Sequence, residues 1–451
     1  MVTPETAMNS VGSISESLAE KIRLRTAVVG VIGLGYVGLP LLRAFHAGGF
    51  HVLGVDIDQS KIDDLNAGRS YLKHLGDDLV RDLHGSPRFS CTTDFQKLCQ
   101  ADAIILCVPT PLGRHLEPDM TYIERTTDSV AAVLRLGQLV VLESTTYPGT
   151  TREVMQPRLE KTGLRCGSDY FLAYSPERED PGRKDFNTQS IPKLVGGIDA
   201  ISGKLAAALY SGAVQKIVHV NSAEIAEAAK LLENIYRCVN IAMVNEMKVV
   251  LTAMGINIWE VIDAAATKPF GFQPFYPGPG LGGHCIPIDP FYLTWKAREV
   301  GQSTRFIELA GQVNHYMPDY VVHRTGLALN NVGKSVHGSK ILVLGLSYKP
   351  DIDDVRESPS FELIEKLDEL GAHVDYNDPH VPQTRRMRRY DLKMKSVSLT
   401  PAALASYDAV VVSTHHKAYD WQMIADHARL IVDTRNAMAK ISGRRDHIVL
   451  A

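Results

Sequence analysis

The chain has 451 residues, of which 45% are hydrophobic and 22% are charged, and its formal net charge is -3 at pH 7. This length leaves room for two or three domains, and the composition is that of a globular protein rather than a disordered or membrane chain. The weak negative charge supplies no basic field, which argues against nucleic acid as a partner.

The first 25 residues contain no apolar stretch of the kind that a secretory signal needs. No later stretch approaches the length of a membrane span. We therefore expect a cytoplasmic protein without a membrane partner, in which residues 1–25 form an N-terminal extension. The six cysteines are widely spaced and form no CxxC pair, so the sequence predicts reduced thiols and no metal site.

A dinucleotide-binding pattern begins the first predicted domain, residues 26–215. Residues 26–32 form a short apolar run, followed by a GxGxxG turn, a helical stretch and a second apolar run at residues 51–55. Further strand candidates at residues 102–108 and 139–143 are followed directly by Pro, Thr or Ser. Short buried runs that alternate with helical stretches are typical of a parallel sheet. The pattern predicts a doubly wound α/β domain.

The turn and the acid that follows it indicate which cofactor binds. Gly33 permits a tight turn, Gly35 lets the backbone approach a pyrophosphate, and Gly38 allows close packing of the helix. Asp56 at the end of the second strand can accept hydrogen bonds from ribose hydroxyls, and its charge disfavours a 2'-phosphate. NAD is therefore expected rather than NADP. The alternative is a glycine-rich turn that binds nothing, with a solvated Asp56.

A long helical stretch, residues 222–254, dominates the second predicted domain, residues 216–325. Its length exceeds the need of one small domain, which suggests that it also packs against a second subunit in a homodimer or higher homo-oligomer. Lys230 and Asn234 lie four residues apart and thus on one face of this helix. The two side chains can serve one small site, although a lone lysine more often faces solvent.

Cys285 follows a glycine-rich loop that is suited to close approach of a ligand. The segment from Phe275 to Asp289 reads FYPGPGLGGHCIPID. A free cysteine is often only buried filler, but the flanking glycines argue against that reading. His284 and Cys285 form a conceivable metal site, yet no second Cys or His pair stands at ligand spacing. The loop therefore favours a reactive thiol and leaves these alternatives open.

Four more strand candidates follow in the C-terminal part of the chain, residues 340–346, 373–376, 409–413 and 430–433. They predict a second α/β domain over residues 326–451. The turn after its first strand lacks the GxGxxG pattern, so we do not expect it to repeat the cofactor role. The predicted fold class is thus α/β, with two Rossmann-like doubly wound domains joined by a long central helix.

Several separate motifs occur in one order along the chain: GLGYVGLP, VPTP, STTYPGT, SPERE, the lysine helix, GPGLGGHCIPIDP and GLSYKPDIDDVRES. With these motifs, residues 26–440 resemble the UDP-glucose/GDP-mannose dehydrogenase family. Within that family, GGHCIPIDPFYLTWKAR and SPEREDPGR look most like the UDP-N-acetylglucosamine 6-dehydrogenases of bacterial polysaccharide synthesis.

The resemblance implies roles for individual residues. The catalytic set it implies comprises Cys285 as nucleophile with Lys230, Asn234, Glu177, Asp289 and Thr145. The cofactor set comprises Gly33, Gly35, Tyr36, Val37, Gly38, Asp56, Lys61, Thr110, Thr146 and Arg356. The set for a UDP-sugar comprises Glu177, Arg178, Lys230, Asn234, Gly282, Lys349 and Arg435.

The implied reaction is oxidation of a C6 alcohol to a carboxylate with two NAD per turnover and no release of the aldehyde. His284 and Ile288 stand where the UDP-glucose branch has serine and lysine, which favours a UDP-N-acetylhexosamine as substrate, UDP-GlcNAc first. UDP-ManNAc and UDP-glucose remain as alternatives. Two other functions are alternatives. A two-electron β-hydroxyacid dehydrogenase would need neither Cys285 nor the C-terminal domain. A non-catalytic nucleotide sensor would not need the intact catalytic set.

Overall fold

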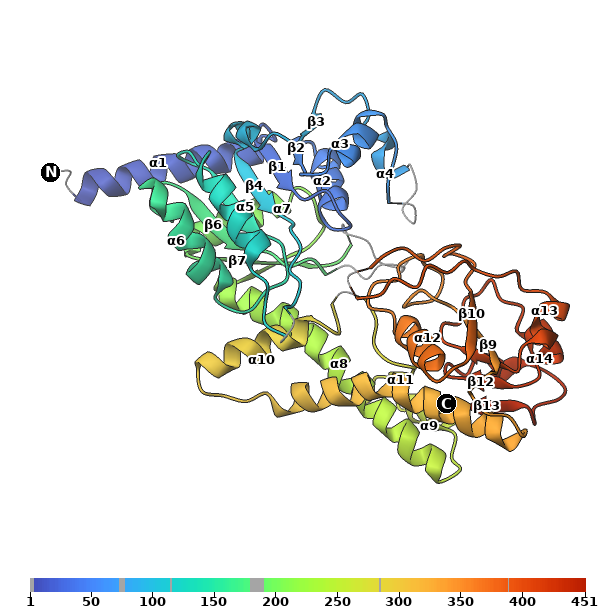
Figure 1. Cartoon of the computed structure of the whole chain (residues 1–451). Coiled ribbons are helices and arrows are strands. Elements are labelled where there is room, and N and C mark those ends of the chain that lie inside the picture. The colour runs from blue at the N-terminus through green and yellow to red at the C-terminus, as the bar shows by residue number, and fades with distance from the viewer. Residues whose placement is uncertain (1–3, 73–77, 114–115, 179–189, 284, 388) are drawn as a thin grey trace. The chain divides into compact units, whose positions relative to one another are not determined.

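The computed structural model describes residues 4–72, 78–113, 116–178, 190–283, 285–387 and 389–451. The chain folds into two compact units. The first comprises residues 1–233 and 291–302, and the second comprises residues 234–290 and 303–451. Each unit is built around one sheet, and the elements are labelled in Figure 1.

The first unit contains an eight-stranded sheet with the order β3-β2-β1-β4-β5-β6-β7-β8. The strands are β1 (Val28–Ile32), β2 (His51–Val55), β3 (Phe89–Thr92), β4 (Ala103–Leu106), β5 (Leu139–Leu142), β6 (Phe171–Tyr174), β7 (Lys193–Gly197) and β8 (Ile217–Val220). All neighbours are parallel except β6 and β7. The strand order reverses between β1 and β4, which is where open α/β sheets bind ligands at their carboxyl edge.

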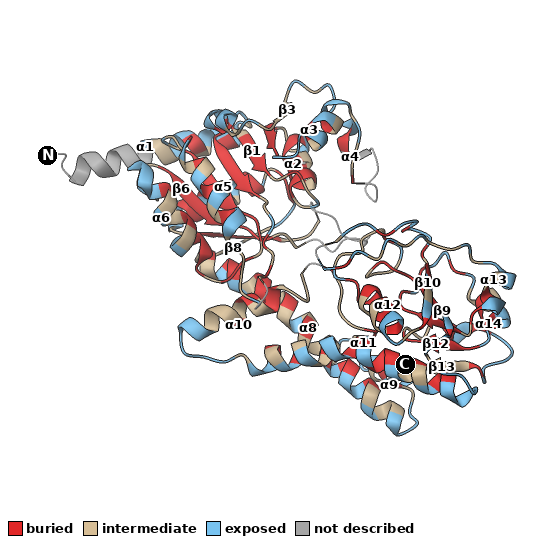
Figure 2. Ribbon diagram, viewed as in Figure 1, coloured by how far each residue is buried: buried red, intermediate tan, exposed pale blue. Residues whose placement is uncertain are grey.

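Helices cover this sheet, and its strands β4, β5, β6 and β7 are buried along their whole length (Figure 2). The helices are α1 (Pro4–Arg23), α2 (Gly38–Ala47), α3 (Gln59–Asn66), α4 (Asp78–Arg81), α5 (Thr121–Ala131), α6 (Gln156–Leu159) and α7 (Ala200–Tyr210), with most of α10 (Asp289–Glu299). Burial on both faces explains why the strands read as continuous apolar runs. Residues 1–25 were predicted only as an N-terminal extension, yet Leu18 and Ile22 of α1 belong to the hydrophobic core.

The second unit contains a five-stranded, wholly parallel sheet with the order β10-β9-β11-β12-β13. Its strands are β9 (Lys340–Leu344), β10 (His373–Asn377), β11 (Ala409–Val412), β12 (Ile431–Asp433) and β13 (Ile448–Leu450), and its helices are α9 (Ile258–Ala266), α11 (Arg305–Asn331), α12 (Pro359–Glu369), α13 (Pro401–Ser406) and α14 (Trp421–His427). The four predicted strands of this region are confirmed, and β13 is additional.

Helix α8 (Ala223–Ala253) has 31 residues and contributes to both units. The predicted α/β fold class, with two sheet domains joined by a long helix, is confirmed. The division into residues 1–25, 26–215, 216–325 and 326–451 stays a prediction. Within the described part of the chain, no helix has the length and apolar character required to cross a membrane.

Candidate active site

The GxGxxG turn lies between β1 and α2, and its geometry requires the glycines. Gly33 has φ of 87°, and a Cβ there would lie 2.3 Å from the carbonyl oxygen of Cys107. A Cβ at Gly38 would lie 1.9 Å from the carbonyl oxygen of Gly33. At Gly35, by contrast, a Cβ would meet no atom within 4 Å. The backbone of Gly35 is thus open to a closely approaching ligand such as a pyrophosphate.

The start of α2 completes this turn. Val37 occupies the N-cap position and provides no side-chain cap to the first helical N–H groups. Tyr36 beside it is partly exposed. Uncapped N–H groups and the positive end of the helix dipole favour an anionic ligand. These residues therefore fit the pyrophosphate of a dinucleotide.

Asp56 follows β2 and is only 5% exposed. Its Oδ2 accepts hydrogen bonds from the backbone N–H of Leu34 (2.8 Å) and from Lys61 (2.9 Å). Its Oδ1 accepts from the backbone N–H of Asp58 (3.0 Å). Asp56 therefore ties the glycine turn to the end of β2, a role in addition to the predicted contact with ribose.

The loops after β4 and β5 meet at the same edge of the sheet. Ser144 Oγ donates to the carbonyl of Val108 (2.7 Å), and the buried Thr146 Oγ1 shares a hydrogen bond of 2.6 Å with Thr150. Thr110 is buried, and its carbonyl accepts from the hydroxyl of Tyr292. Thr145 is half-buried between Ser144 and Thr146.

Glu227 on α8 anchors the loop after β5. Its carboxylate accepts hydrogen bonds from the backbone N–H groups of Gly149 (2.6 Å) and Thr151 (3.0 Å) and from the Thr151 hydroxyl (2.7 Å). Burial raises the pKa of Glu227 to about 7, although these hydrogen bonds act in the opposite direction. The helix of Lys230 and the loop of Thr145 and Thr146 are thus joined inside the first unit.

Glu177 and Arg178 follow β6. Glu177 Oε1 accepts from the backbone N–H of Arg178 (2.6 Å). The Arg178 guanidinium pairs with Glu233 of α8 (2.6 Å) and donates to the carbonyl of Pro192 (2.6 Å). Lys230, one turn before Glu233, is 5% exposed and has no hydrogen-bond or ion-pair partner among the residues that the structure describes.

Three buried polar residues near Glu177 were missed by the sequence analysis: Glu143, Lys193 and Tyr210. The ammonium of Lys193 contacts Glu143 and lies 3.4 Å from Glu177 Oε2, and the Tyr210 hydroxyl donates to Glu143. Lys193 begins β7, the one strand that runs antiparallel to its neighbour β6. Only the strand direction brings Lys193 to the carboxyl edge of β5 and β6, so no sequence motif could have placed it there.

In the second unit the structure brings Cys285, Asp289 and Asn234 together. The carbonyl of Cys285 accepts hydrogen bonds from the backbone N–H groups of Ile288 (3.2 Å) and Asp289 (2.8 Å). Asp289 is buried and accepts from the side-chain amide of Asn234, whose oxygen accepts from Arg237. The half-buried Cys285 therefore stands on a turn that is fixed through Asp289 to α8. His284 lies outside the described residues.

The glycine-rich loop before Cys285 is held by two buried side chains of α8. Asn245 Oδ1 accepts from the backbone N–H of Gly278 (3.0 Å), and Lys248 Nζ lies 3.3 Å from the Gly278 carbonyl oxygen, to which it donates. Burial, together with Arg435 and Arg324, lowers the pKa of Lys248 to about 7. The N–H and the carbonyl of Gly278 are thus both bound by side chains on one face of α8.

Further along, the loop packs on the segment after β9. The Gly283 N–H donates to the carbonyl of Arg356 (2.9 Å), and a Cβ at Gly282 or Gly283 would come within 3 Å of Tyr348. Glycine is therefore required at both positions. Arg356 was predicted to bind the cofactor, and its guanidinium pairs with Asp354 (2.7 Å). It belongs to the second unit, whereas the other nine predicted cofactor residues belong to the first.

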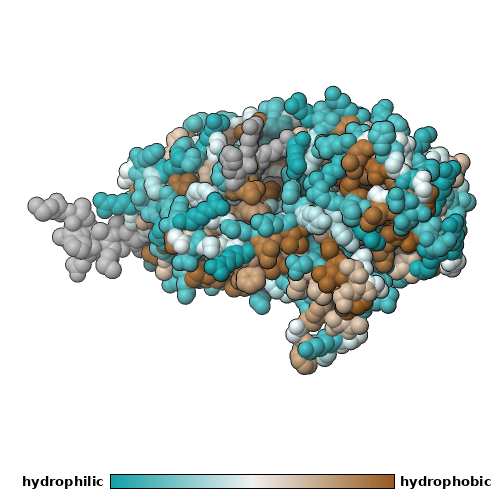
Figure 3. All heavy atoms as spheres, turned by 60° about the horizontal axis from the view of Figure 1, so that its bottom comes forward, coloured by the Kyte–Doolittle hydropathy of each residue, from teal (hydrophilic) through white to brown (hydrophobic). Residues whose placement is uncertain are grey.

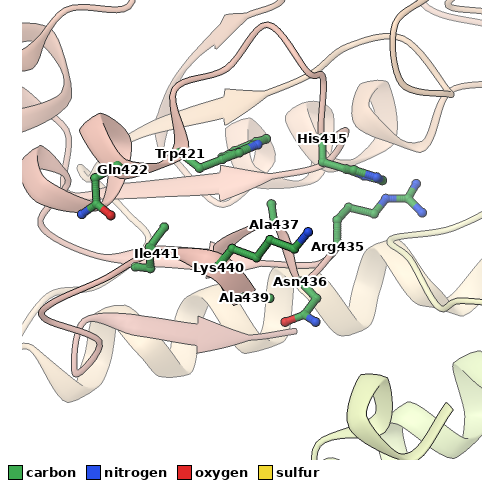
Figure 4. Close-up of a pocket in the computed structure, with 9 residues that line it drawn as sticks. All are labelled: His415, Trp421, Gln422, Arg435, Asn436, Ala437, Ala439, Lys440 and Ile441. Carbon is green, nitrogen blue, oxygen red and sulfur yellow. The ribbon is translucent and has the colours of Figure 1, made fainter. Parts of the chain in front are cut away.

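Lys349 and Arg435 follow strands β9 and β12, whose carboxyl ends share one edge of the second sheet. Arg435 lines a pocket of about 420 Å³ together with His415, Trp421 and Lys440 (Figure 4). Arg435 Nε donates to the carbonyl of Ser413 (2.9 Å), and burial lowers the pKa of Arg435 to about 10. Lys349 does not line this pocket.

One group of side chains in the second unit has the composition of a metal site. Ligand atoms of Asp351, His380 and His416 lie within 4.8 Å of one another. However, His416 Nδ1 accepts from the backbone N–H of Asp351 (2.9 Å), and its Nε2 faces Asp378 (3.1 Å). Both ring nitrogens are thus engaged by protein groups, and we assign no metal to this group.

These features define a class of protein: a dehydrogenase-type α/β protein with a dinucleotide turn in one unit and a loop-borne thiol in the other. Comparison with known proteins gives the family. The NAD binding domain of the UDP-glucose/GDP-mannose dehydrogenase family matches residues 27–214, its central domain matches residues 224–316, and its UDP binding domain matches residues 342–440. The chain belongs to the UDP-glucose/GDP-mannose dehydrogenase family, and it is an NAD-dependent nucleotide-sugar dehydrogenase.

Curated relatives and solved structures support this assignment over nearly the whole chain. The UDP-N-acetyl-D-glucosamine 6-dehydrogenase of Pseudomonas aeruginosa is 36% identical over 396 residues, which cover 87% of this chain and 91% of the relative. The UDP-N-acetyl-D-mannosamine dehydrogenase of Pyrococcus horikoshii is 34% identical over 414 residues, 90% of this chain and 95% of the relative. A solved structure of UDP-D-ManNAc dehydrogenase from Pyrococcus horikoshii matches with a TM-score of 0.84 at 32% identity, covering 94% of this chain and 98% of that one.

Proposed function

We propose that this protein oxidises the C6 alcohol of a UDP-N-acetylhexosamine, UDP-GlcNAc first, to the uronic acid. The observation that carries the proposal is the placement of Cys285 on a tight glycine-rich loop whose turn is fixed to α8 through Asp289 and Asn234. A relative named for UDP-N-acetyl-D-glucosamine supports the choice of sugar. The product fits the synthesis of a surface polysaccharide.

The first step removes a proton and a hydride from the C6 alcohol and leaves an aldehyde. NAD, when bound at the Gly33–Gly38 turn, supplies the hydride acceptor. A base removes the hydroxyl proton through ordered water. The ammonium of Lys230 stabilises the developing alkoxide, since a negative charge beside an ammonium in a dry site costs less than one alone.

In the second step the Cys285 thiolate adds to the aldehyde carbon and forms the alkoxide of a thiohemiacetal. Loss of a hydride from this alkoxide, for which a second bound NAD would be the acceptor, leaves a thioester on Cys285. The covalent bond would keep the aldehyde on the enzyme. Water held by Glu177, with Thr145 and Asp289, then attacks the thioester carbonyl and expels the Cys285 thiolate. Lys230 and Asn234 stabilise the tetrahedral oxyanion.

The second unit contributes the predicted contacts with the UDP-sugar. Gly282 lets the substrate approach the loop backbone, and Lys349 and Arg435 contact the nucleotide part. The cationic lining of the Arg435 pocket, which also includes Lys440, supports an anionic ligand there. Arg178, next to Glu177, is a further proposed contact of the sugar.

The test is a panel of UDP-GlcNAc, UDP-ManNAc, UDP-GalNAc and UDP-glucose with NAD, in which the rate and the NADH formed per sugar acid are measured. We expect about two NADH per acid with UDP-GlcNAc, as in any four-electron oxidation by NAD. One NADH per substrate would instead indicate a two-electron dehydrogenase. The Cys285→Ser variant is expected to lose steady-state NADH production, and normal turnover by this variant would refute the role of the thiol.

UDP-ManNAc is the second candidate substrate, because several relatives are named as UDP-N-acetyl-D-mannosamine dehydrogenases at 32% to 34% identity. The same panel distinguishes the two epimers. A higher kcat/KM for UDP-ManNAc than for UDP-GlcNAc would transfer the proposal to the manno sugar. The four-electron chemistry of Cys285 would be unchanged.

We also propose that the protein forms a homo-oligomer through α8. Apolar side chains are exposed along this helix at Tyr236, Met243, Met247 and Val250, and at Met254 directly after its last residue. Their spacing of seven, four, three and four residues places them on one stripe of the helix. Figure 3 shows apolar side chains gathered in patches on the surface. A cytoplasmic location stays a prediction.

A further inference from the structure

Glu177 belongs to a buried group of charged side chains at the edge of the first sheet. Glu143 directly follows β5, Glu177 comes three residues after β6, and Lys193 begins β7. Since β5 and β6 are parallel and β7 is antiparallel to β6, all three residues lie at the same edge. The Lys193 ammonium donates to Glu143 Oε1 and lies 3.4 Å from Glu177 Oε2.

Lys193 is fixed between the two carboxylates. The Lys193 side chain is 4% exposed and that of Glu143 is completely buried, whereas that of Glu177 is 16% exposed. Glu143 is itself held by the hydroxyl of Tyr210. Burial opposes the charged form of Lys193, but the carboxylates of Glu143 and Glu177 outweigh this effect and raise the pKa of Lys193. Lys193 therefore remains an ammonium at neutral pH.

The carboxylate of Glu177 has a donor on each oxygen. Oε2 faces Lys193, and Oε1 accepts from the backbone N–H of Arg178 (2.6 Å). The Arg178 guanidinium is fixed in turn by Glu233 and by the carbonyl of Pro192. Two donors on different oxygens fix the plane of a carboxylate, and a nearby ammonium favours its ionised form.

We propose that Lys193 is a positioning residue for Glu177. Lys193 holds the Glu177 carboxylate ionised and oriented, while Glu143 and Tyr210 keep the ammonium in place. Lys193 itself transfers no proton and forms no bond to the substrate. This inference rests on the proposed function, in which Glu177 holds the water that hydrolyses the thioester on Cys285. An ionised carboxylate can accept a proton from that water, whereas a protonated one cannot.

Other ionisable groups act on the same cluster. Cys107 and Tyr210 face Glu143, and burial raises the pKa of both, so both remain neutral across the range in which a carboxylate titrates. Arg178, whose backbone N–H contacts Glu177, forms an ion pair with Glu233. Among the residues that the structure describes, Lys193 is thus a cation that pairs directly with the Glu177 carboxylate, so its removal should affect the ionisation of Glu177.

The test compares E143Q with K193M/E143Q in the full-length protein. The two variants differ only at residue 193, and the shared E143Q substitution prevents an unpaired buried carboxylate in the double variant. The enzyme is mixed with NAD and UDP-GlcNAc, or with UDP-ManNAc if the panel favours it. Decay of the Cys285 acyl adduct is followed by rapid quench and intact-protein mass spectrometry from about pH 5 to about pH 9. Lys216→Met serves as a surface control, since Lys216 is exposed on the loop before β8.

We expect the acid limb of the decay rate to lie about one pH unit higher in K193M/E143Q than in E143Q, because loss of the ammonium makes Glu177 harder to ionise. At pH values below the acid limb, the adduct should decay about tenfold more slowly in K193M/E143Q than in E143Q. K193R/E143Q keeps the positive charge, so the acid limb of its decay rate should coincide with that of E143Q. Lys216→Met should match the unmodified protein.

Coincident acid limbs in E143Q and K193M/E143Q would overturn the proposal. If K193M/E143Q and K193Q/E143Q both fail to fold while K193R/E143Q folds, Lys193 is a structural residue and the proposal is equally refuted. Failure of the proposed function would look different: the unmodified protein would form no Cys285 adduct, or only one NADH per substrate.

Discussion

The side chain of Asp378 accepts a hydrogen bond from the backbone N–H of Leu346 (2.6 Å). The first unit contains the same relationship, in which Asp56 accepts from the N–H of Leu34 (2.8 Å). In both units the aspartate follows the second strand, and the N–H belongs to the residue after a glycine with φ near 85°. The two sheets thus share this connection, although only the first has the GxGxxG turn.

Substitution Asp378→Asn is expected to destabilise the protein by about 2–3 kcal/mol at neutral pH, because an amide cannot accept all the hydrogen bonds that the carboxylate accepts. Burial would raise the pKa of Asp378, but the hydrogen bond from His416 and several backbone N–H groups lower it overall. A lowered pKa gives stability above the unfolded pKa of about 4, and that stability is lost as the pH falls through the folded value.

Urea denaturation of the unmodified protein and Asp378→Asn, measured at neutral and acidic pH, checks this prediction. The difference in the free energy of unfolding should shrink in acid. Asp368→Asn, at an exposed position of α12, is the control and should change little. A difference that does not depend on pH would contradict the ionised state of Asp378.

Lys248 predicts a pH dependence of stability that comes from a buried cation rather than from a buried carboxylate. The pKa of its buried ammonium is lowered to about 7 by burial, Arg435 and Arg324. Between about pH 7 and about pH 10 the folded state binds fewer protons than the unfolded state, so stability should rise with pH by up to about 1.4 kcal/mol per unit. Lys248→Met lacks this contribution. The free energies of unfolding of the unmodified protein and of Lys248→Met are measured at several pH values, with the exposed Lys268→Met as control. If the two free energies change with pH in parallel, the prediction is refuted.

Glu227 has a raised pKa of about 7 because it is buried. A raised carboxyl pKa gives stability that is complete below the unfolded value of about 4.3 and is lost as the pH rises through about 7. Glu227→Gln should therefore be destabilised relative to the unmodified protein in mild acid, and the difference should decrease toward neutral pH. Thermal melts over this range test it, with the exposed Glu246→Gln on the same helix as control. A difference in stability that grows toward neutral pH would contradict the raised pKa of Glu227.

Asp56→Asn should weaken NADH binding about tenfold to a hundredfold, because the hydrogen bonds of a charged acceptor to ribose are lost. Discrimination against NADPH should decrease as well, since the negative charge that repels a 2'-phosphate is gone. Titrations that follow NADH and NADPH fluorescence measure both effects, and circular dichroism checks the fold. Unchanged affinity in a folded variant would remove Asp56 from the cofactor site. Asp63→Asn, at an exposed position of α3, is the control.

The exposed stripe on α8 predicts that Met243→Lys combined with Met247→Lys dissociates a homo-oligomer. Each lysine would bury a charge in an apolar interface, which association cannot tolerate without a partner. Light scattering coupled to gel filtration measures the mass. The control is Leu370→Lys at an exposed apolar residue after α12. A monomeric unmodified protein would contradict the predicted association.

Much of the fold could be predicted from local sequence patterns. Gly33 and Gly38 could be predicted because each is required by its own backbone geometry, and the buried strands could be predicted because a parallel sheet covered on both faces needs continuous apolar runs. Strands β3, β7, β8 and β13 were missed, since three- to five-residue runs near the end of a sheet carry too little periodicity. Helix α1 was missed because its stability depends on Leu18 and Ile22 packing against the first unit rather than on local pattern.

By itself the sequence determined the chemistry available to this protein: a turn for a dinucleotide, Asp56 at a strand end, and Cys285 beside glycines, because each of these depends on residues close together in the chain. Which distant groups support these features depends on how the whole chain folds. Lys193 reaches Glu177 because β7 runs antiparallel to β6, and Gly278 is held by Asn245 and Lys248 because α8 packs on that loop. Contacts of this kind arise from strand direction and helix packing, which no short sequence motif records.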